Sequence, residues 1–278
     1  MSVRTVIEKA NADGRAALIG YLPVGFPDLP TSIAAARAMV AAGVDVVELG
    51  LPYSDPLMEG PVIQRAVEAA LRAGTRPRDV LAAVEQVAEA GAPVLVMTYW
   101  NPVERYGVDA FAADLAAAGG AGLITPDIIP DEAGDWIAAS DRHGLDRVFL
   151  VAPSSTDARL RLTVDACRGW VYAASTMGVT GVRQRVDVRA KALVERTRAA
   201  GGDLVCVGLG VSTREQAAQV AGFADGVIVG SALVRAAGAG TGDAGAAIEA
   251  VTSLVGELSA GVADAAPVPA PPPAGVPG

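Results

Sequence analysis

The sequence has few aromatic residues and very little histidine or cysteine. Of its 278 residues, 4% are aromatic, one is histidine and two are cysteine. The single histidine, His143, excludes histidine-rich metal sites and argues against a Ser–His catalytic triad. Cys167 and Cys206 are too few for a disulfide framework, and no Cys-x-x-Cys pair is available for zinc or redox chemistry.

Basic residues are also in the minority, and long apolar runs are missing. Asp and Glu number 31 against 22 Lys and Arg, which gives a formal net charge of −9. An acidic chain without a basic stripe is a poor candidate for binding nucleic acid or an anionic membrane. No run approaches ~18 apolar residues, and residues 1–4 lead into no apolar signal core. We therefore predict a soluble cytoplasmic protein, in which backbone amides can still bind a small anion.

What the chain does contain is a regular alternation of short β-branched runs and longer Ala-rich helical stretches. The runs are nearly continuous in apolar residues, as expected for parallel strands covered on both faces. The predicted strands are Ala17–Tyr21, Val46–Leu49, Val94–Thr98, Gly122–Thr125, Arg147–Val151, Val171–Ala174, Leu204–Val207 and Gly226–Val229.

Eight β/α units in one chain predict a closed (β/α)8 TIM barrel of the α/β class over residues 1–258. The alternative is an open, doubly wound sheet. Residues Val3–Ala12 are predicted as an N-terminal extra helix that closes the bottom of the barrel. Residues 259–278 are rich in Pro and Ala, and we predict a disordered tail there, with a proline-rich partner motif as the alternative.

Glu48 is the first candidate for chemistry. It lies near the end of the second predicted strand, between Val47 and Leu49, where packing does not explain a carboxylate. Burial would raise its pKa and suit it to proton transfer. The alternative is a structural Glu paired with a distant basic residue, because no Lys or Arg lies between Arg37 and Arg65.

The loop after this strand, residues 52–61, carries two more carboxylates, Asp55 and Glu59. Three prolines and a glycine give the loop a defined shape rather than a helix. A second carboxylate near Glu48 would allow an acid and a base to act on one substrate. Asp55, followed by Pro56, also fits a simple turn.

Glycine clusters follow the sixth, seventh and eighth predicted strands, at 177–181, 208–212 and 229–231. TIM barrels often bind phosphate through loops at this end and through the N-terminus of a short extra helix. Glycine lets backbone N–H groups approach the anion, and Ser231 adds a hydroxyl. The joint position of the clusters predicts a phosphate site.

Several segments together resemble the α subunit of tryptophan synthase. They are Tyr21–Pro27, Glu48–Pro56 with Gly60 and Pro61, Gly178–Gly181, and Gly230–Ser231. The similarity covers residues 1–258 and leaves out the tail.

This resemblance implies a (β/α)8 barrel that cleaves indole-3-glycerol phosphate to indole and glyceraldehyde 3-phosphate in the last stage of tryptophan biosynthesis. It implies no cofactor or metal in this subunit. It also implies a partner, a pyridoxal-phosphate β subunit, in an α2β2 heterotetramer through which indole passes.

The resemblance also assigns roles to individual residues, by position. The implied catalytic residues are Glu48, which would protonate indole C3, and Glu59, which would interact with the indole N–H. The implied phosphate-binding residues are Gly181, Gly210, Gly230 and Ser231. The residues implied to line or support the indole pocket are Tyr21, Met97, Tyr99, Asp127, Tyr172 and Thr180. The residues implied to face the β subunit are Pro52, Asp55 and Asn101.

One position departs from the family pattern. The second catalytic carboxylate is normally aspartate, and here it is Glu59, whose side chain is longer by about 1.5 Å. Misplacement on the order of 1 Å can cost ~10²-fold in rate. The alternatives to an active lyase subunit are therefore an impaired subunit that mainly activates a β subunit, and a different phosphate-binding barrel isomerase.

Overall fold

The structure of the protein, a computed structural model, describes residues 2–174, 188–208, 210–240 and 242–265. Eight parallel strands form one closed barrel in the order β1 to β8, with β8 paired to β1. The strands are β1 (Ala17–Pro23), β2 (Val46–Gly50), β3 (Val94–Met97), β4 (Gly122–Thr125), β5 (Asp146–Val151), β6 (Val171–Ala174), β7 (Val205–Gly208) and β8 (Gly226–Val229). The predicted TIM barrel is confirmed, and the open sheet is excluded.

Burial explains why these segments form strands. Every residue of β1, β2, β4 and β8 is buried, so both faces of these strands are covered. One face packs against the helices, and the other fills the barrel with side chains such as Ile19, Val46 and Leu95. Because side chains alternate along a strand, this second face also supplies the residues at the carboxyl end of the barrel.

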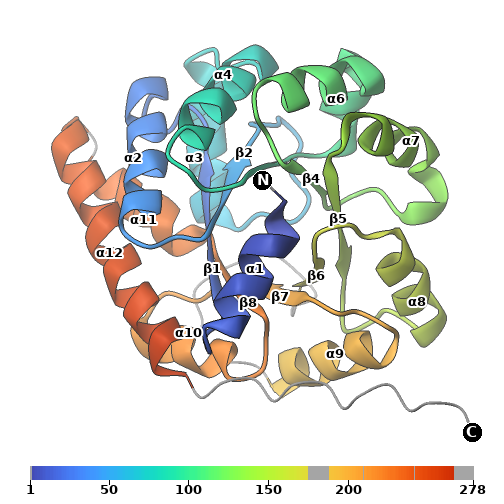
Figure 1. The fold of residues 1–278 in the computed structure, drawn as a ribbon. Helices are drawn as coiled ribbons and strands as arrows, with labels where there is room; N and C mark the ends of the chain where they lie inside the picture. The colour runs from blue at the N-terminus through green and yellow to red at the C-terminus, as the bar shows by residue number, and fades with distance from the viewer. Residues whose placement is uncertain (1, 175–187, 209, 241, 266–278) are drawn as a thin grey trace, which may run out of the picture.

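Helices surround the barrel (Figure 1). They are α1 (Val3–Ala12), α2 (Leu29–Ala41), α3 (Pro61–Arg72), α4 (Pro77–Ala88), α5 (Trp100–Tyr106), α6 (Val108–Ala117), α7 (Gly134–His143), α8 (Asp157–Ala166), α9 (Val188–Ala199), α10 (Arg214–Ala221), α11 (Ser231–Ala239) and α12 (Ala244–Asp264), with a 3₁₀ turn at Pro130–Glu132. The eight predicted β/α units did not include α5 or α12.

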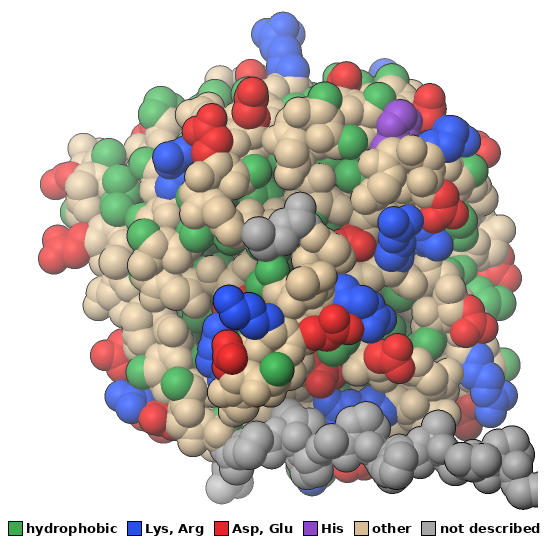
Figure 2. Space-filling model, viewed as in Figure 1, with side chains coloured by type: hydrophobic (Ala, Val, Ile, Leu, Met, Phe, Trp, Pro, Cys, Tyr) green, Lys and Arg blue, Asp and Glu red, His purple; other side chains and the backbone are tan. Residues whose placement is uncertain are grey.

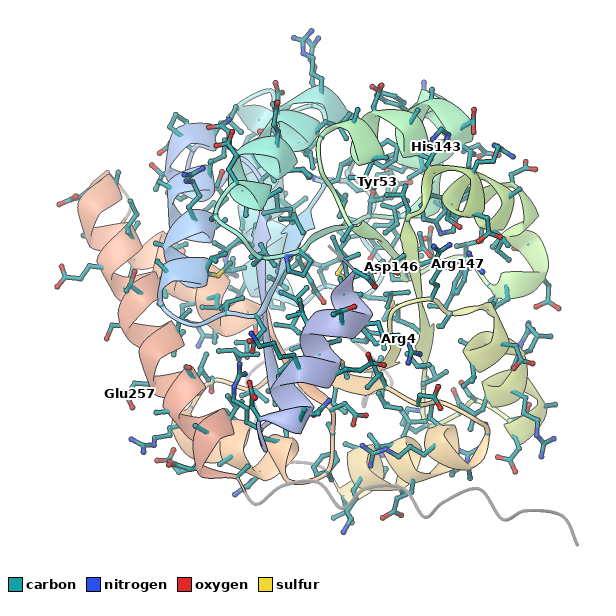
Figure 3. All side chains as sticks on the ribbon, in the orientation of Figure 1. Arg4, Tyr53, His143, Asp146, Arg147 and Glu257 are labelled. Carbon is teal, nitrogen blue, oxygen red and sulfur yellow. The ribbon has the colours of Figure 1, made fainter. Side chains whose placement is uncertain are left out.

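Helix α1 closes the amino-terminal end of the barrel, as predicted, and crosses the centre of the view in Figure 1. Its Val3 and Ile7 are fully buried against the lower barrel residues. The buried carboxylate of Asp146, at the start of β5, accepts hydrogen bonds from the Ser2 hydroxyl at 3.2 Å and the Val3 N–H at 3.0 Å. Figure 3 labels Asp146 at this end of the barrel, beside α1.

Helix α12 corrects the predicted start of the tail. It runs to Asp264, so residues 259–264, which we had assigned to the disordered segment, are helical. Gly261 and Val262 are buried, and a Cβ at Gly261 would collide with the Arg214 carbonyl of α10. The guanidinium of Arg214 also pairs with Asp264 at 2.7 Å. The remaining tail, 266–278, lies outside the described residues.

By length and composition alone, α12 is apolar enough to cross a membrane. It lies along α2 and α11 on the outside of the barrel and also packs on α10 (Figure 1). Val251, Val255 and Leu258 are fully buried in these contacts. Packing within the fold therefore accounts for these three apolar residues.

The face that carries α1 has a mixed charge. Figure 2 shows acidic and basic side chains interspersed there. No basic stripe is visible on this face, which agrees with the expectation from composition.

Candidate active site

A pocket opens at the carboxyl end of the barrel strands. Eight of the residues singled out in the sequence line it together. They are Tyr21, Glu48, Glu59, Met97, Tyr172, Gly210, Gly230 and Ser231. Residues from opposite ends of the chain therefore meet in one cavity, where the fold places reactive groups.

Glu48 lies at the floor of this pocket on β2, with 1% of its surface exposed. Its Oε1 atom has no hydrogen-bond partner, and the structure gives Glu48 no ion pair with any described residue. Burial raises the pKa of Glu48 from 4.5 to about 8. At neutral pH it is therefore mainly a neutral acid, able to donate a proton. Among the described residues, no basic side chain pairs with Glu48, so they give no support to the alternative of a structural Glu.

Two tyrosines flank Glu48, and each lies against a glycine of the next strand. Tyr21 is in register with Glu48 across β1 and β2, and a Cβ at Gly50 would collide with the Tyr21 hydroxyl. A Cβ at Gly208 on β7 would likewise collide with the hydroxyl of Tyr172 on β6. The absence of a Cβ at these two glycines thus lets each tyrosine approach the neighbouring strand closely. Burial and the charge of Glu48 both raise the pKa of Tyr172.

The same pocket is lined by three of the predicted phosphate-binding groups, Gly210, Gly230 and Ser231. Ser231 is the first residue of α11, with 4% of its surface exposed, and its buried hydroxyl has no hydrogen-bond partner. Gly230 precedes it, and Gly210 has a φ of 71°, in the left-handed region that favours glycine. Free N–H groups at a helix start and an unpaired hydroxyl form a suitable site for an anion.

Glu59 enters the pocket from the loop between β2 and α3. Its Oε2 atom accepts a hydrogen bond from the Tyr99 hydroxyl and a longer one, 3.3 Å, from the Met58 N–H. Glu59 and Glu48 line the same cavity, so two carboxylates face one ligand space. Glu48 is buried with an oxygen that has no hydrogen-bond partner, whereas Glu59 is held by hydrogen bonds, and this favours different roles for them.

Comparison with known proteins shows the family of this chain. The sequence model described as "Tryptophan synthase alpha chain" matches residues 7–263. The tryptophan synthase alpha chain of Mycobacterium avium is 64% identical over 257 residues, covering 92% of this chain and 93% of that protein. That of Thermobifida fusca is 60% identical over 267 residues, covering 95% and 98%. The chain belongs to the tryptophan synthase alpha chain family.

The structural comparison gives the same result. A solved structure of Mycobacterium tuberculosis tryptophan synthase superposes with a TM-score of 0.88 at 60% identity, covering 94% of this chain and 97% of that one. The family consists of lyases that act on indole-3-glycerol phosphate, and this chain is such an enzyme. The similarities do not favour the impaired subunit or the isomerase.

The other family positions lie around the pocket rather than in it. Tyr99 lines a smaller adjoining cavity, which it shares with Tyr21, Glu59 and Met97. The carboxylate of Asp127 accepts the Trp100 N–H at 2.9 Å and so caps α5, directly after Tyr99. Asp127 therefore supports the site and does not line either cavity.

Of the three positions implied to face a β subunit, Asp55 and Asn101 are exposed and Pro52 is buried. Pro52 and Asn101 line an open groove next to the site. Asp55 is exposed and accepts a hydrogen bond from the Ser54 hydroxyl at 2.6 Å. Thr180 and Gly181, with their glycine cluster, lie outside the described residues.

Sequence reasoning missed several apolar lining residues. Met58, Ile63, Leu150 and Ile228 complete the pocket wall. Leu150 and Ile228 occupy inward positions near the ends of β5 and β8, so the two-residue period of the strands was a usable signal. Among the described residues, no group of three or more His, Cys, Asp or Glu side chains is placed to hold a metal ion.

Proposed function

We propose that the chain cleaves indole-3-glycerol phosphate by proton transfer at Glu48, with Glu59 stabilising the charge that develops on the indole ring. The observation that carries this proposal is the pairing of a buried, unpartnered acid with a hydrogen-bonded second carboxylate in one pocket. The buried Ser231 hydroxyl, which has no hydrogen-bond partner, supports phosphate binding in the same pocket.

Glu48 acts twice in this mechanism. As a neutral acid it gives a proton to indole C3, which makes that carbon tetrahedral and leaves positive charge near N1. As a carboxylate it then takes the proton of the glycerol hydroxyl, while the bond from C3 to the glycerol carbon breaks. The electron pair of that bond returns to the ring, so indole and an aldehyde leave and Glu48 is again protonated. A pKa of about 8 suits both transfers near neutral pH.

Glu59 has an electrostatic role. A fixed carboxylate next to the indole N–H opposes the positive charge that forms when C3 is protonated. Because Glu59 lines the same cavity as Glu48, it faces the same ring.

The phosphate group binds mainly through backbone N–H groups at Gly210, Gly230 and the start of α11. Ser231→Ala should therefore raise KM only modestly. Gly210→Val should raise it much more, because valine disfavours a φ of 71° and blocks close approach.

We further propose that this subunit works without a cofactor or metal, since carboxylates supply both proton transfers. Pyridoxal phosphate belongs to a β-subunit partner, in an α2β2 complex located in the cytoplasm. The solved M. tuberculosis relative is tryptophan synthase, which supports such a partner. The groove lined by Pro52 and Asn101 is the proposed contact surface.

The test is single-turnover release of indole from indole-3-glycerol phosphate, with and without a saturating β subunit. Glu59→Ala should lower kcat strongly, because the developing charge loses its counter-charge. Glu59→Asp should keep or raise kcat, because it restores the usual side chain of the family. If Glu59→Ala cleaves as fast as an active parent, Glu59 is not the second catalytic carboxylate, and Asp55 or Asp127 becomes the candidate.

A further inference from the structure

We propose that Tyr99 is a positioning residue that adapts this site to the longer side chain of Glu59. The inference rests on the proposed role of Glu59 and adds to it. It concerns one hydroxyl group, which ties the carboxylate to the backbone of its own loop.

The Tyr99 hydroxyl has a complete set of hydrogen bonds. Its oxygen accepts the Leu57 N–H at 2.7 Å and the Met58 N–H at 2.9 Å. A phenol oxygen has two acceptor positions and one proton. With both acceptor positions used, its proton is directed to Oε2 of Glu59. The direction of this hydrogen bond is therefore set by the two amides.

Tyr99 is itself held in place. Its side chain is 3% exposed, and its ring packs on Tyr53 with centroids 5.1 Å apart. It precedes α5, whose first N–H is capped by Asp127. A rigid hydroxyl can fix the position of a carboxylate that it binds.

The length of Glu59 gives this contact its importance. Its side chain is longer than that of aspartate by about 1.5 Å and has one more rotatable bond. The hydrogen bonds it makes to described residues both fall on Oε2, from Tyr99 and Met58. Oε2 is thus the anchored oxygen, and Oε1 is left to accept the N–H of the indole ring. Without the Tyr99 hydroxyl, Glu59 would sample several rotamers and misplace its charge.

The kinetic test combines Tyr99→Phe with Glu59→Ala in single-turnover indole release. In the parent, Tyr99→Phe should lower kcat about 10–100-fold, the effect of a carboxylate displaced by roughly 1 Å. KM should change less than about three-fold, since the proposed phosphate-binding residues are untouched. In the Glu59→Ala background, Tyr99→Phe should change kcat less than about two-fold, because no carboxylate remains to be positioned.

Tyr106→Phe is the matched control. The Tyr106 hydroxyl also donates to a carboxylate, Asp114 at 2.6 Å, and Tyr106 lines neither cavity that contains Glu59. Because Tyr106 lines the groove proposed for the β subunit, this control is measured without the β subunit. Tyr106→Phe should leave kcat within about two-fold of the parent. An equal loss from Tyr99→Phe in both backgrounds would assign Tyr99 to loop structure instead, and no loss in the parent would also overturn the proposal.

A second measurement does not depend on turnover. With 3-fluorotyrosine incorporated, the fluorine NMR signal of Tyr99, assigned through Tyr99→Phe, reports its hydroxyl. Glu59→Ala should shift this signal and lower the pKa of Tyr99, because burial and the hydrogen bond to Glu59 both raise that pKa in the parent. An unchanged signal refutes the contact. If Glu59→Ala shifts the Tyr99 signal as expected but the parent releases no indole, the proposed function is refuted and the contact between Tyr99 and Glu59 stands.

Discussion

The two ends of the barrel each bury a carboxylate, and the two carboxylates differ in their hydrogen-bond partners. Asp146, at the amino end, accepts hydrogen bonds from Ser2 and Val3, and Arg168 lies 4.0 Å away. Glu48, at the carboxyl end, has an oxygen with no partner. Burial raises the pKa of both groups, but at Asp146 the hydrogen bonds from Val3 and Ser2 oppose the rise.

The difference separates a structural carboxylate from a reactive one. Asp146 holds the first turn of α1 against the barrel, so its interactions stabilise the fold. Glu48 stabilises nothing that the structure describes, and its burial costs free energy while preparing it to give a proton. A buried carboxylate is therefore a functional candidate when its partners are missing, not merely because it is buried.

The largest expected effect is on catalysis at the carboxyl end. Glu48→Gln keeps the volume of the side chain but removes the proton donor, so indole release should fall by about 10²–10⁴-fold. Circular dichroism should show an unchanged fold. Activity within a few-fold of the parent would show that Glu48 is not the proton donor. The distinction between a reactive Glu48 and a structural Asp146 would then be wrong.

The same variant should also change how stability depends on pH. The pKa of Glu48 is about 8 in the folded protein, against an ordinary value of 4.5, so the folded state binds more protons between these values. The free energy of unfolding of the parent should therefore decrease from about pH 5 to pH 8. Glu48→Gln lacks the titrating carboxyl group, so its free energy of unfolding at pH 7 should exceed that of the parent by on the order of 1–3 kcal/mol. Denaturant unfolding at several pH values measures this, and parallel curves for the two proteins would contradict it.

A substitution at the amino end should lower stability and leave catalysis nearly unchanged. Asp146→Ala leaves the buried Val3 N–H without its acceptor, which should lower the free energy of unfolding by about 1–3 kcal/mol. Indole release measured well below the melting temperature should stay within about two-fold of the parent. A large loss of kcat without a loss of stability would show that the two ends are coupled.

The smallest effects are expected at the carboxyl terminus. Deletions there serve as the reference against which the effects of the Glu48 and Asp146 substitutions are compared. Deleting 266–278 should leave the melting temperature and indole release unchanged, because its Pro- and Ala-rich sequence lacks an apolar periodicity for docking.

Deleting 259–278 should lower the melting temperature by several degrees, because it removes Val262 from the core and the Arg214–Asp264 ion pair. Equal melting curves would show that the end of α12 contributes nothing.

Much of the fold was predictable because its signals are local. Strand runs of β-branched residues and the helix at Val3–Ala12 could be read directly, and their ends differ by at most two residues from those observed. Helix α5 was missed because its start depends on Asp127, which lies 27 positions further along the chain. The end of α12 was missed because Gly261 packs on the Arg214 carbonyl, a contact that composition does not reveal.

The candidate site was predictable where a residue conflicts with its surroundings. A carboxylate in an apolar strand identified Glu48, and glycine clusters after late strands indicated Gly210, Gly230 and Ser231. The hydrogen bond from Tyr99 to Glu59 could not be found this way, because a tyrosine after a strand is ordinary in sequence and its partner is 40 positions away.

The sequence by itself determined the barrel and the candidate acid at position 48, because the period of apolar residues and the chemistry of a side chain are local properties. Among the loop carboxylates, only the resemblance to the family selected position 59. Only the tertiary structure decided which carboxylate lacks partners and which hydroxyl orients Glu59. Burial and hydrogen bonding depend on groups that closure of the barrel brings together from distant parts of the chain.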